Sequence, residues 1–304
     1  MKKLAGYILQ YTRELNTTGL FLISVLTAFF IYLNYQYHIE VSLLRLHNPV
    51  IRFLGFLVLY LLMFGGSYLV LVQIRQPLSA TPFFLVLIIL APAIYAWRMS
   101  SKLITSQLTW FLSAPWDKYW ALILNPPVKC LIILFIIFLL KKRGVYGESI
   151  TGLQRKNILI RPFLIMLICF IPVVIIAGIQ PDFRMAYPKA TKVNFVADHI
   201  SQPWITALIF EISYAFDFLI AEVFFRGFLV LAFIRYAGPA AILPMASFYC
   251  AIHFGKPLIE CISSFFGAIM LGAISYRTGS VLGGLFLHLG LGWMMEVIGF
   301  LMRF

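Results

Sequence analysis

Apolar runs of about 20 residues recur along the whole sequence, and they constrain the fold more than any other feature. They lie at residues 18–36, 52–73, 83–98, 121–140, 162–179, 205–235, 239–254, 258–276 and 281–302. Hydrophobic residues make up 62% of the 304 residues and charged residues only 12%, whereas about a quarter of an average soluble domain is charged. A soluble fold could not bury so much apolar surface. The sequence therefore predicts an all-α polytopic membrane protein.

The number of spans depends on the region after the third run. That run is short and ends at Arg98, and the following stretch, 103–120, fits the membrane interface as well as it fits a span. We therefore expect a bundle of eight to nine transmembrane helices. Four cysteines fall within predicted runs and match no CxxC pair, so we expect them to be buried as small apolar side chains. They are Cys130, Cys169, Cys250 and Cys261.

The net charge of +13 points to a membrane topology rather than to nucleic acid, because Lys and Arg collect in the cytoplasmic loops of membrane proteins. We place the densest basic run, 141–161, in the cytoplasm, and Lys2, Lys3 and Arg13 place the N-terminus there as well. The polar loop 181–203 is then extracytoplasmic. We expect membrane lipid as a partner and no nucleic acid, in a cell membrane of the bacterial inner-membrane type.

The loop 181–203 also divides the chain by composition. We expect residues 1–203 to form N-terminal transmembrane helices with little intramembrane charge, and 204–304 to form a separate transmembrane domain. Charged or titratable side chains lie in or beside the apolar helices of this second part at Glu211, Asp217, Glu222, Arg226, His253, Glu260, His288 and Glu296. A charge at the bilayer centre costs about 2.5–3.5 kcal/mol, so such residues indicate function. Any chemistry is therefore expected in 204–304.

Glu222, Arg226, His253 and His288 form the candidate site. Glu222 and Arg226 are four residues apart, which places them on one helix face, where an ion pair that only orients the helix is the alternative to catalysis. A carboxylate with two imidazoles can activate water directly or bind zinc, and both routes lead to hydrolysis. Zinc held by Glu222, His253 and His288 is the less favoured route, because no HExxH run is present.

The order of these motifs resembles the CPBP family, which comprises type II CAAX prenyl proteases, bacteriocin-processing enzymes and abortive-infection relatives. The motifs are ExxxRG, an aromatic residue four before a His, and a second His in a Gly-rich helix. The resemblance implies about eight membrane helices around an intramembrane cavity that opens to the cytosolic leaflet. It also implies that a Glu and a His activate water against a peptide bond, while another His and an Asn stabilise the oxyanion.

Two positions depart from the family pattern. The motifs fall on Ala221, Glu222 and Arg226, on Tyr249 and His253, and on His288 and Gly292. Ala221 stands where the family has the water-activating Glu, and Gly292 stands where it has the Asn. Ala221 is either a feature of a bacterial branch with a single Glu, or an engineered or degenerate position. We expect Glu222 to replace the missing base, with Asp217 as another candidate.

Three functions are compatible with this pattern. The first is an intramembrane peptidase of the metallo- or glutamate type, which hydrolyses a peptide bond in a membrane-associated peptide or protein. The second is an inactive member of the same fold that binds a peptide or acts as a scaffold. The third is a transporter that uses the charged cluster, although the sequence shows no repeat of the kind that transporters carry.

Overall fold

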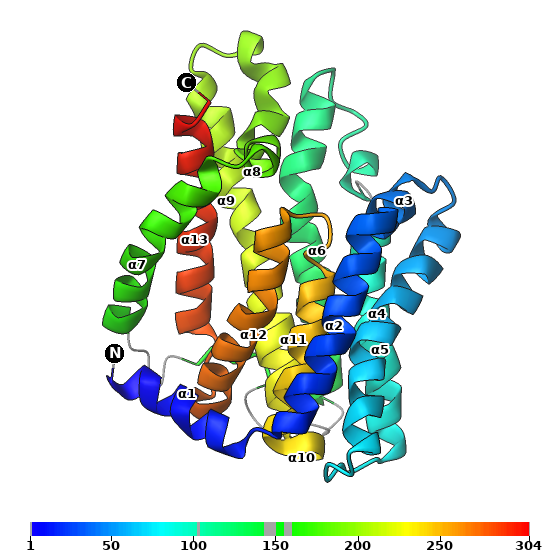
Figure 1. Cartoon of the computed structure of the whole chain (residues 1–304). Coiled ribbons are helices and arrows are strands. Elements are labelled where there is room, and N and C mark those ends of the chain that lie inside the picture. Colours follow the sequence, from blue (N-terminus) through cyan, green and yellow to red (C-terminus); the bar gives the residue numbers. More distant parts are fainter. Residues whose placement is uncertain (1, 102–103, 143–149, 155–159, 304) are drawn as a thin grey trace. The chain divides into compact units, whose positions relative to one another are not determined.

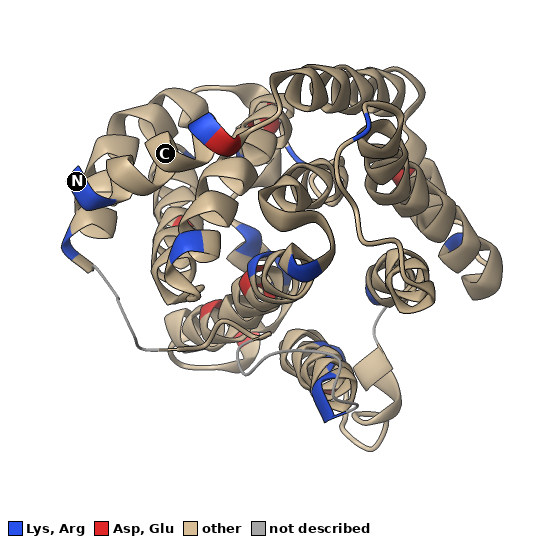
Figure 2. Ribbon diagram, turned by 90° about the horizontal axis from the view of Figure 1, so that it is seen from below, with Lys and Arg blue, Asp and Glu red and all other residues tan. Residues whose placement is uncertain are grey.

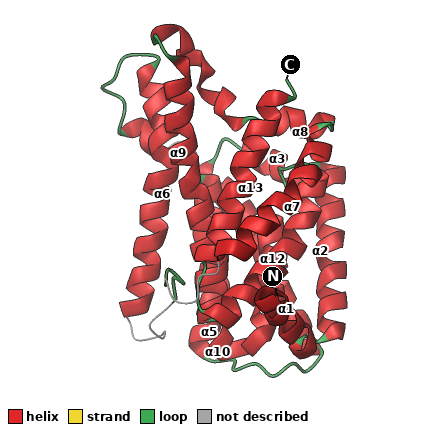
Figure 3. Cartoon of the chain, turned by 90° about the vertical axis from the view of Figure 1, so that its left-hand side faces the viewer, coloured by secondary structure: helices red, strands yellow, loops and turns green. Residues whose placement is uncertain are grey.

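The computed structural model describes residues 2–101, 104–142, 150–154 and 160–303, and all the regular structure in these ranges is helical (Figures 1 and 3). Seven of the described helices have the length and apolar composition needed to cross a membrane. They are α2 (Thr17–Tyr37), α4 (Pro49–Gln73), α5 (Pro82–Ser100), α6 (Trp116–Lys142), α7 (Ile160–Gly178), α12 (Leu258–Thr278) and α13 (Leu282–Leu301). The prediction of an all-α polytopic membrane protein is confirmed.

The other two predicted spans are helical but not regular. The range 205–235 is divided into α9 (Pro203–Ala221), the π-helix η3 (Glu222–Ala232) and the short α10 (Ile234–Ala237). The range 239–254 holds the 3₁₀ turn η4 (Gly238–Ala241) and α11 (Ile242–Ala251). All ten residues of α11 are buried, so it is a core helix enclosed by protein.

The described chain divides into two compact units that are interleaved along the sequence. The first comprises Met1–Ser101, Arg143–Asn157 and Val223–Val281, and the second comprises Lys102–Lys142, Ile158–Glu222 and Leu282–Phe304. The predicted division between residues 203 and 204 rests on sequence composition, and it stays a prediction.

Aromatic packing around α11 forms the core of the first unit. Phe248 of α11 lies 5.0 Å from Tyr60 and 5.5 Å from Phe64, both on α4, between ring centroids. Tyr95 of α5 and Phe225 contact the same ring at 6.0 and 5.2 Å. Around this core, α4 and α5 run side by side, α2 packs on α4 and α11, and α1 (Lys2–Glu14) packs on α12 (Figure 1).

Glycines on α13 bring the helices of the second unit into close contact. A Cβ atom at Gly290 would lie 2.7 Å from Leu167 of α7, and one at Gly283 would overlap the ring of Phe163 of the same helix. In the membrane, where lipid offers no hydrophobic drive for association, such close approach supplies the packing energy. The glycines at 283 and 290 therefore let α7 pack closely on α13.

The described segments outside the spans contain short helices. The stretch 103–120 contains the 3₁₀ turn η1 (Ile104–Gln107) before α6 begins, and 181–203 contains α8 (Pro181–Ala186) and the 3₁₀ helix η2 (Lys189–His199). Within the basic run 141–161, residues 143–149 and 155–159 lie outside the described residues. The cytoplasmic placement of that run stays a prediction. Lys, Arg, Asp and Glu residues occupy few positions along the ribbon (Figure 2).

The cysteines differ from the prediction at one position. Cys130, Cys250 and Cys261 are buried as expected, but Cys169 is exposed on α7. The prediction was wrong there because α7 presents much of its surface outward, as the exposure of Leu164 and Ile168 shows. An apolar span touches protein on some faces and lipid on the others, and Cys169 is on a face that no described helix covers.

Candidate active site

Glu222 begins the π-helix η3 directly where α9 ends at Ala221. A π-helix has i→i+5 hydrogen bonds, so each turn holds more residues than an α-turn and the side chains rotate less from one residue to the next. The side-chain directions expected from a regular α-helix therefore do not hold beyond Ala221. The backbone therefore departs from a regular α-helix over the 11 residues from Glu222 to Ala232.

Glu222 and His288 are brought together in the second unit, although they are 66 positions apart. Oε1 of Glu222 lies 3.0 Å from Nδ1 of His288, which is in the middle of α13. The Glu222 side chain has no exposed surface, whereas 19% of the His288 side chain is exposed. An ionised carboxylate accepts the Nδ1 proton and fixes the tautomer, so the neutral imidazole presents its lone pair at Nε2. His288 is thus the accessible member of the pair.

Phe218 fills the space beside Gly292. A Cβ atom added at Gly292 would lie 2.8 Å from Cε1 of Phe218, on α9, which is closer than real contacts allow. The same ring packs edge-on against the imidazole of His288, with 4.9 Å between centroids. An Asn at this position, which the resemblance implies, cannot be accommodated unless Phe218 moves.

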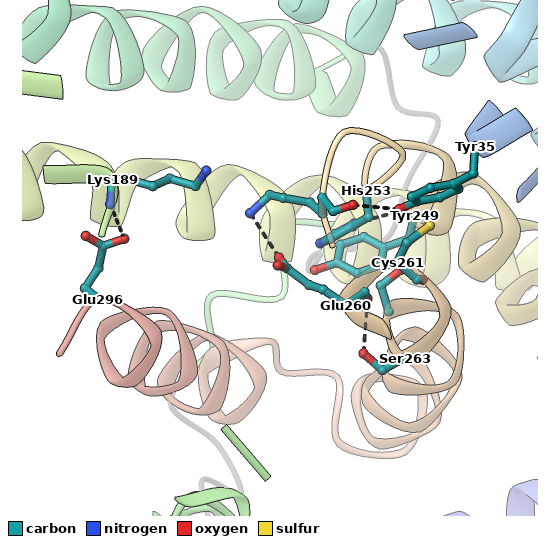
Figure 4. A network of polar contacts seen from close by, with 10 residues as sticks. Tyr35, Lys189, Tyr249, His253, Glu260, Cys261, Ser263 and Glu296 are labelled. Carbon is teal, nitrogen blue, oxygen red and sulfur yellow. Dashed lines mark hydrogen bonds and ion pairs between the residues drawn. The ribbon is translucent and has the colours of Figure 1, made fainter. Parts of the chain in front are cut away.

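His253 lies in the turn that follows α11, in the first unit, and this turn also contains Gly255 and Pro257. Its Nδ1 is 2.9 Å from the carbonyl oxygen of Tyr249, and the two rings are 4.6 Å apart between centroids (Figure 4). A carbonyl only accepts, so Nδ1 carries the proton and Nε2 of the neutral ring is an acceptor. The backbone of α11 therefore sets the tautomer of His253.

Arg226 stacks on Tyr249 as well. Its guanidinium carbon lies 3.9 Å from the centre of the Tyr249 ring, and the side chain is almost fully buried. A cation over an aromatic face at this distance is stabilised by the ring quadrupole. The predicted pairing of Arg226 with Glu222 stays a prediction, and so does a role for Arg226 and His253 in one site with Glu222 and His288.

Two of the other predicted carboxylates have structural partners. Glu296 accepts hydrogen bonds from the backbone N–H groups of Lys189 and Ala190, at 2.9 and 3.2 Å, and so holds the start of η2 (Figure 4). Glu260 forms an ion pair with Lys256 at 3.0 Å on the first turn of α12. These contacts explain both charges without catalysis. The candidacy of Asp217 as the base stays a prediction.

Three polar residues that sequence reasoning missed contact the turn after His253. Asn34, Tyr35 and Glu40 lie at the end of α2 and the start of α3 (Ile39–Arg45), and Asn34 and Glu40 are buried. The available signal was a cluster of polar residues at the end of the first apolar run.

The described residues do not assemble a metal site. No group of three or more His, Cys, Asp or Glu side chains in the described ranges is placed to hold a metal ion. In the second unit, the hydrogen bond between Glu222 and His288 occupies one carboxylate oxygen and one imidazole nitrogen. A shared zinc ion with His253 stays a prediction, and no chemical step below depends on a metal.

Comparison with known protein families identifies the C-terminal part of the chain. Residues 200–294 match the family model described as type II CAAX prenyl endopeptidase Rce1-like. No curated protein and no solved structure shows significant similarity to the chain. The matched range contains Glu222, Arg226, His253, His288 and the position of Gly292, so the residues that carry the resemblance lie inside the region that the model recognises.

Proposed function

We propose that the chain is an intramembrane peptidase that hydrolyses a peptide bond in a membrane-associated peptide or protein, because its residues 200–294 match the Rce1-like family model. The match supports a CAAX-protease-type peptidase in general. The substrate need not be prenylated. We further propose that the protein lies in a bacterial inner membrane with its N-terminus in the cytoplasm.

The observation that carries the proposal is the unequal exposure of the Glu222–His288 pair. Water has no access to a carboxylate without exposed surface, whereas the imidazole is 19% exposed. The pair therefore has the arrangement of a base with an orienting carboxylate, in which the carboxylate holds the tautomer and compensates the charge of the imidazolium. Glu222, expected from the sequence to be the base, acts on water through His288.

The proposed reaction follows from this assignment. Nε2 of neutral His288 takes a proton from water as the water oxygen bonds to the peptide carbonyl carbon, and the carbonyl electron pair moves onto oxygen. When that oxyanion collapses, the C–N bond breaks and the imidazolium returns its proton to the departing amine. Atoms and charge balance with water as the sole co-reactant. We assign His253 and Arg226 to the same reaction, as the second histidine and as the cation that supports the site.

The test is cleavage of a library of membrane-tethered peptides by the protein reconstituted in liposomes. Glu222→Gln and His288→Ala are each expected to lower turnover by about 10²–10⁴-fold, and the double variant is expected to lose little more, because residues that act as a unit are not additive. Glu260→Gln is the matched control, since it makes the same change in a carboxylate with a structural ion pair. Cleavage that survives both single changes would refute the assignment.

Metal dependence is tested in the same assay. Turnover that is unchanged by a zinc chelator agrees with direct activation of water. Loss of turnover on chelation, with recovery on addition of zinc, would replace it with a metal mechanism. The protein's metal content, measured without any substrate, provides a second readout.

One observation favours a second candidate, an inactive member of the fold that binds a peptide. The family's base is replaced by Ala221, and Phe218 occupies the space of the missing Asn side chain at Gly292. In that case the wild type cleaves nothing, yet binds a subset of the peptides. Activity that appears only in Ala221→Glu would show a scaffold from which the chemistry has been removed.

A further inference from the structure

The turn that carries His253 is held by residues far away in the sequence. Nδ2 of Asn34 donates to the carbonyl oxygen of Phe254 at 2.9 Å, and the Tyr35 hydroxyl donates to the carbonyl oxygen of Lys256 at 2.6 Å. Both donors are on the last turn of α2, and Figure 4 shows Tyr35 beside His253. The backbone directly after His253 thus accepts two hydrogen bonds from α2.

Asn34 is itself fixed by the corner between α2 and α3. His38 ends α2 in the left-handed conformation, with φ of 50°, and the chain turns so that the N–H of Glu40 donates to Oδ1 of Asn34 at 2.9 Å. The Asn34 amide therefore joins the backbone of Glu40 to that of Phe254, using both of its ends. Asn34 is buried, so water does not compete for these bonds.

Glu40 adds a steric contact to the same turn. Its carboxylate lies against Gly255, where an added Cβ would be 2.7 Å from Oε1. Only a residue without a side chain fits at 255 while Glu40 stays in place. The corner thus contacts three consecutive residues after His253, and this leaves the turn little freedom.

We propose that Asn34, supported by Tyr35, is a positioning residue for His253 and sets the direction of its imidazole. The ring is fixed at Nδ1 by the Tyr249 carbonyl on α11, but the chain leaves α11 at Ala251, so the ring's place also depends on the turn backbone. A displacement of about 1 Å in a catalytic group can cost 10²-fold in rate. The inference rests on the proposed role of His253, and it extends the site beyond residues 200–294 to the first spanning helix.

The alternative to a positioning role is that Asn34 only stabilises the packing of α2 on α11. The chain offers a matched control for this alternative. Oγ1 of Thr27 lies 2.9 Å from Oγ of Ser247, in a buried contact between the same two helices. Thr27→Val removes that hydrogen bond without touching the turn. An effect specific to positioning must therefore appear in Asn34→Ala and be absent from Thr27→Val.

The experiment compares Asn34→Ala, Tyr35→Phe and Thr27→Val in the reconstituted full-length protein. We expect Asn34→Ala to lower kcat by about tenfold or more with KM nearly unchanged, and to add no further loss in a His253→Ala background. Tyr35→Phe, a smaller change that keeps the ring, is expected to lower kcat less. It provides the test if Asn34→Ala does not fold. Thr27→Val is expected to keep the wild-type kcat.

A second readout is independent of turnover. Diethyl pyrocarbonate modifies accessible neutral imidazoles, and mass spectrometry gives the rate at His253 with His288 as the internal reference. We expect Asn34→Ala to change the His253 rate severalfold while Thr27→Val does not. A wild type that cleaves nothing would refute the peptidase proposal and leave this measurement standing. Rates and kcat values for Asn34→Ala and Tyr35→Phe that equal those of Thr27→Val would overturn the positioning role.

Discussion

Replacing Gly292 with Ala tests whether Phe218 occupies the missing side chain's space. The added Cβ would lie 2.8 and 2.9 Å from Cε1 and Cε2 of Phe218, so the ring must move. Overpacking of this kind costs about 1–3 kcal/mol, against a gain of up to about 1 kcal/mol when Gly becomes Ala inside a helix. We therefore expect Gly292→Ala to lower the free energy of unfolding.

A double-mutant cycle isolates the contact. Phe218→Ala alone is expected to cost about 3–5 kcal/mol because it empties a buried site, but it also opens the space that Gly292→Asn requires. The cost of Gly292→Asn should then fall in the Phe218→Ala background, with a coupling energy of about 1–3 kcal/mol. If the protein is a peptidase, the new amide lies one helical turn after His288, and turnover should rise relative to Phe218→Ala alone.

The assay is unfolding by SDS titration in mixed micelles, with Gly267→Ala as the control. Apart from the backbone of its own helix and its chain neighbours, nothing lies within 4 Å of a Cβ built at Gly267, which is also inside a spanning helix. That variant is expected to be neutral or more stable. If Gly292→Ala shifts the unfolding free energy as Gly267→Ala does, then Phe218 does not fill the position and the explanation for the missing Asn is wrong.

Three further predictions concern topology and buried contacts. Reporters fused within 141–161 and near Ala190 are expected to report inside and outside, respectively, and the reverse pattern would overturn the proposed orientation. Glu296→Ala leaves two backbone donors of η2 without their acceptor, so protease cleavage of that segment should accelerate in detergent. Arg226→Met removes the cation over Tyr249, and unfolding should become easier by about 1–2 kcal/mol; an unchanged unfolding curve would show that the stacking contributes nothing.

The α9–η3 segment shows where sequence reasoning reaches its limit. The apolar range 205–235 predicts a helix, and the described chain is helical across nearly all of it. The change to a π-helix at Glu222 was not predicted, because no local propensity distinguishes an α-turn from a π-turn. A regular α geometry leaves Glu222 about 100° from the position of the family's base, whereas the π-helix alters that direction.

The sequence by itself determined the class of protein, most of the spanning helices and the candidate residues for the proposed chemistry. These are local properties, because the length of an apolar run and the cost of a charge within it can be evaluated one segment at a time. The charged residues of 204–304 were identified in this way, but their partners were not. Only the tertiary structure showed that Glu222 pairs with His288 and that Glu296 accepts a hydrogen bond from the backbone of η2. It also showed that Phe218 lies against Gly292.

The proposed role of Asn34 also depends on contacts that only the tertiary structure shows. Its partners are six and 220 positions away, and nothing in the first apolar run indicates either of them. Contacts of this kind depend on how several helices pack at once, since a side chain bonds to whichever group the packing brings within reach. Periodicity and composition describe each helix alone, so they specify which groups need a partner and leave the choice of partner to the fold.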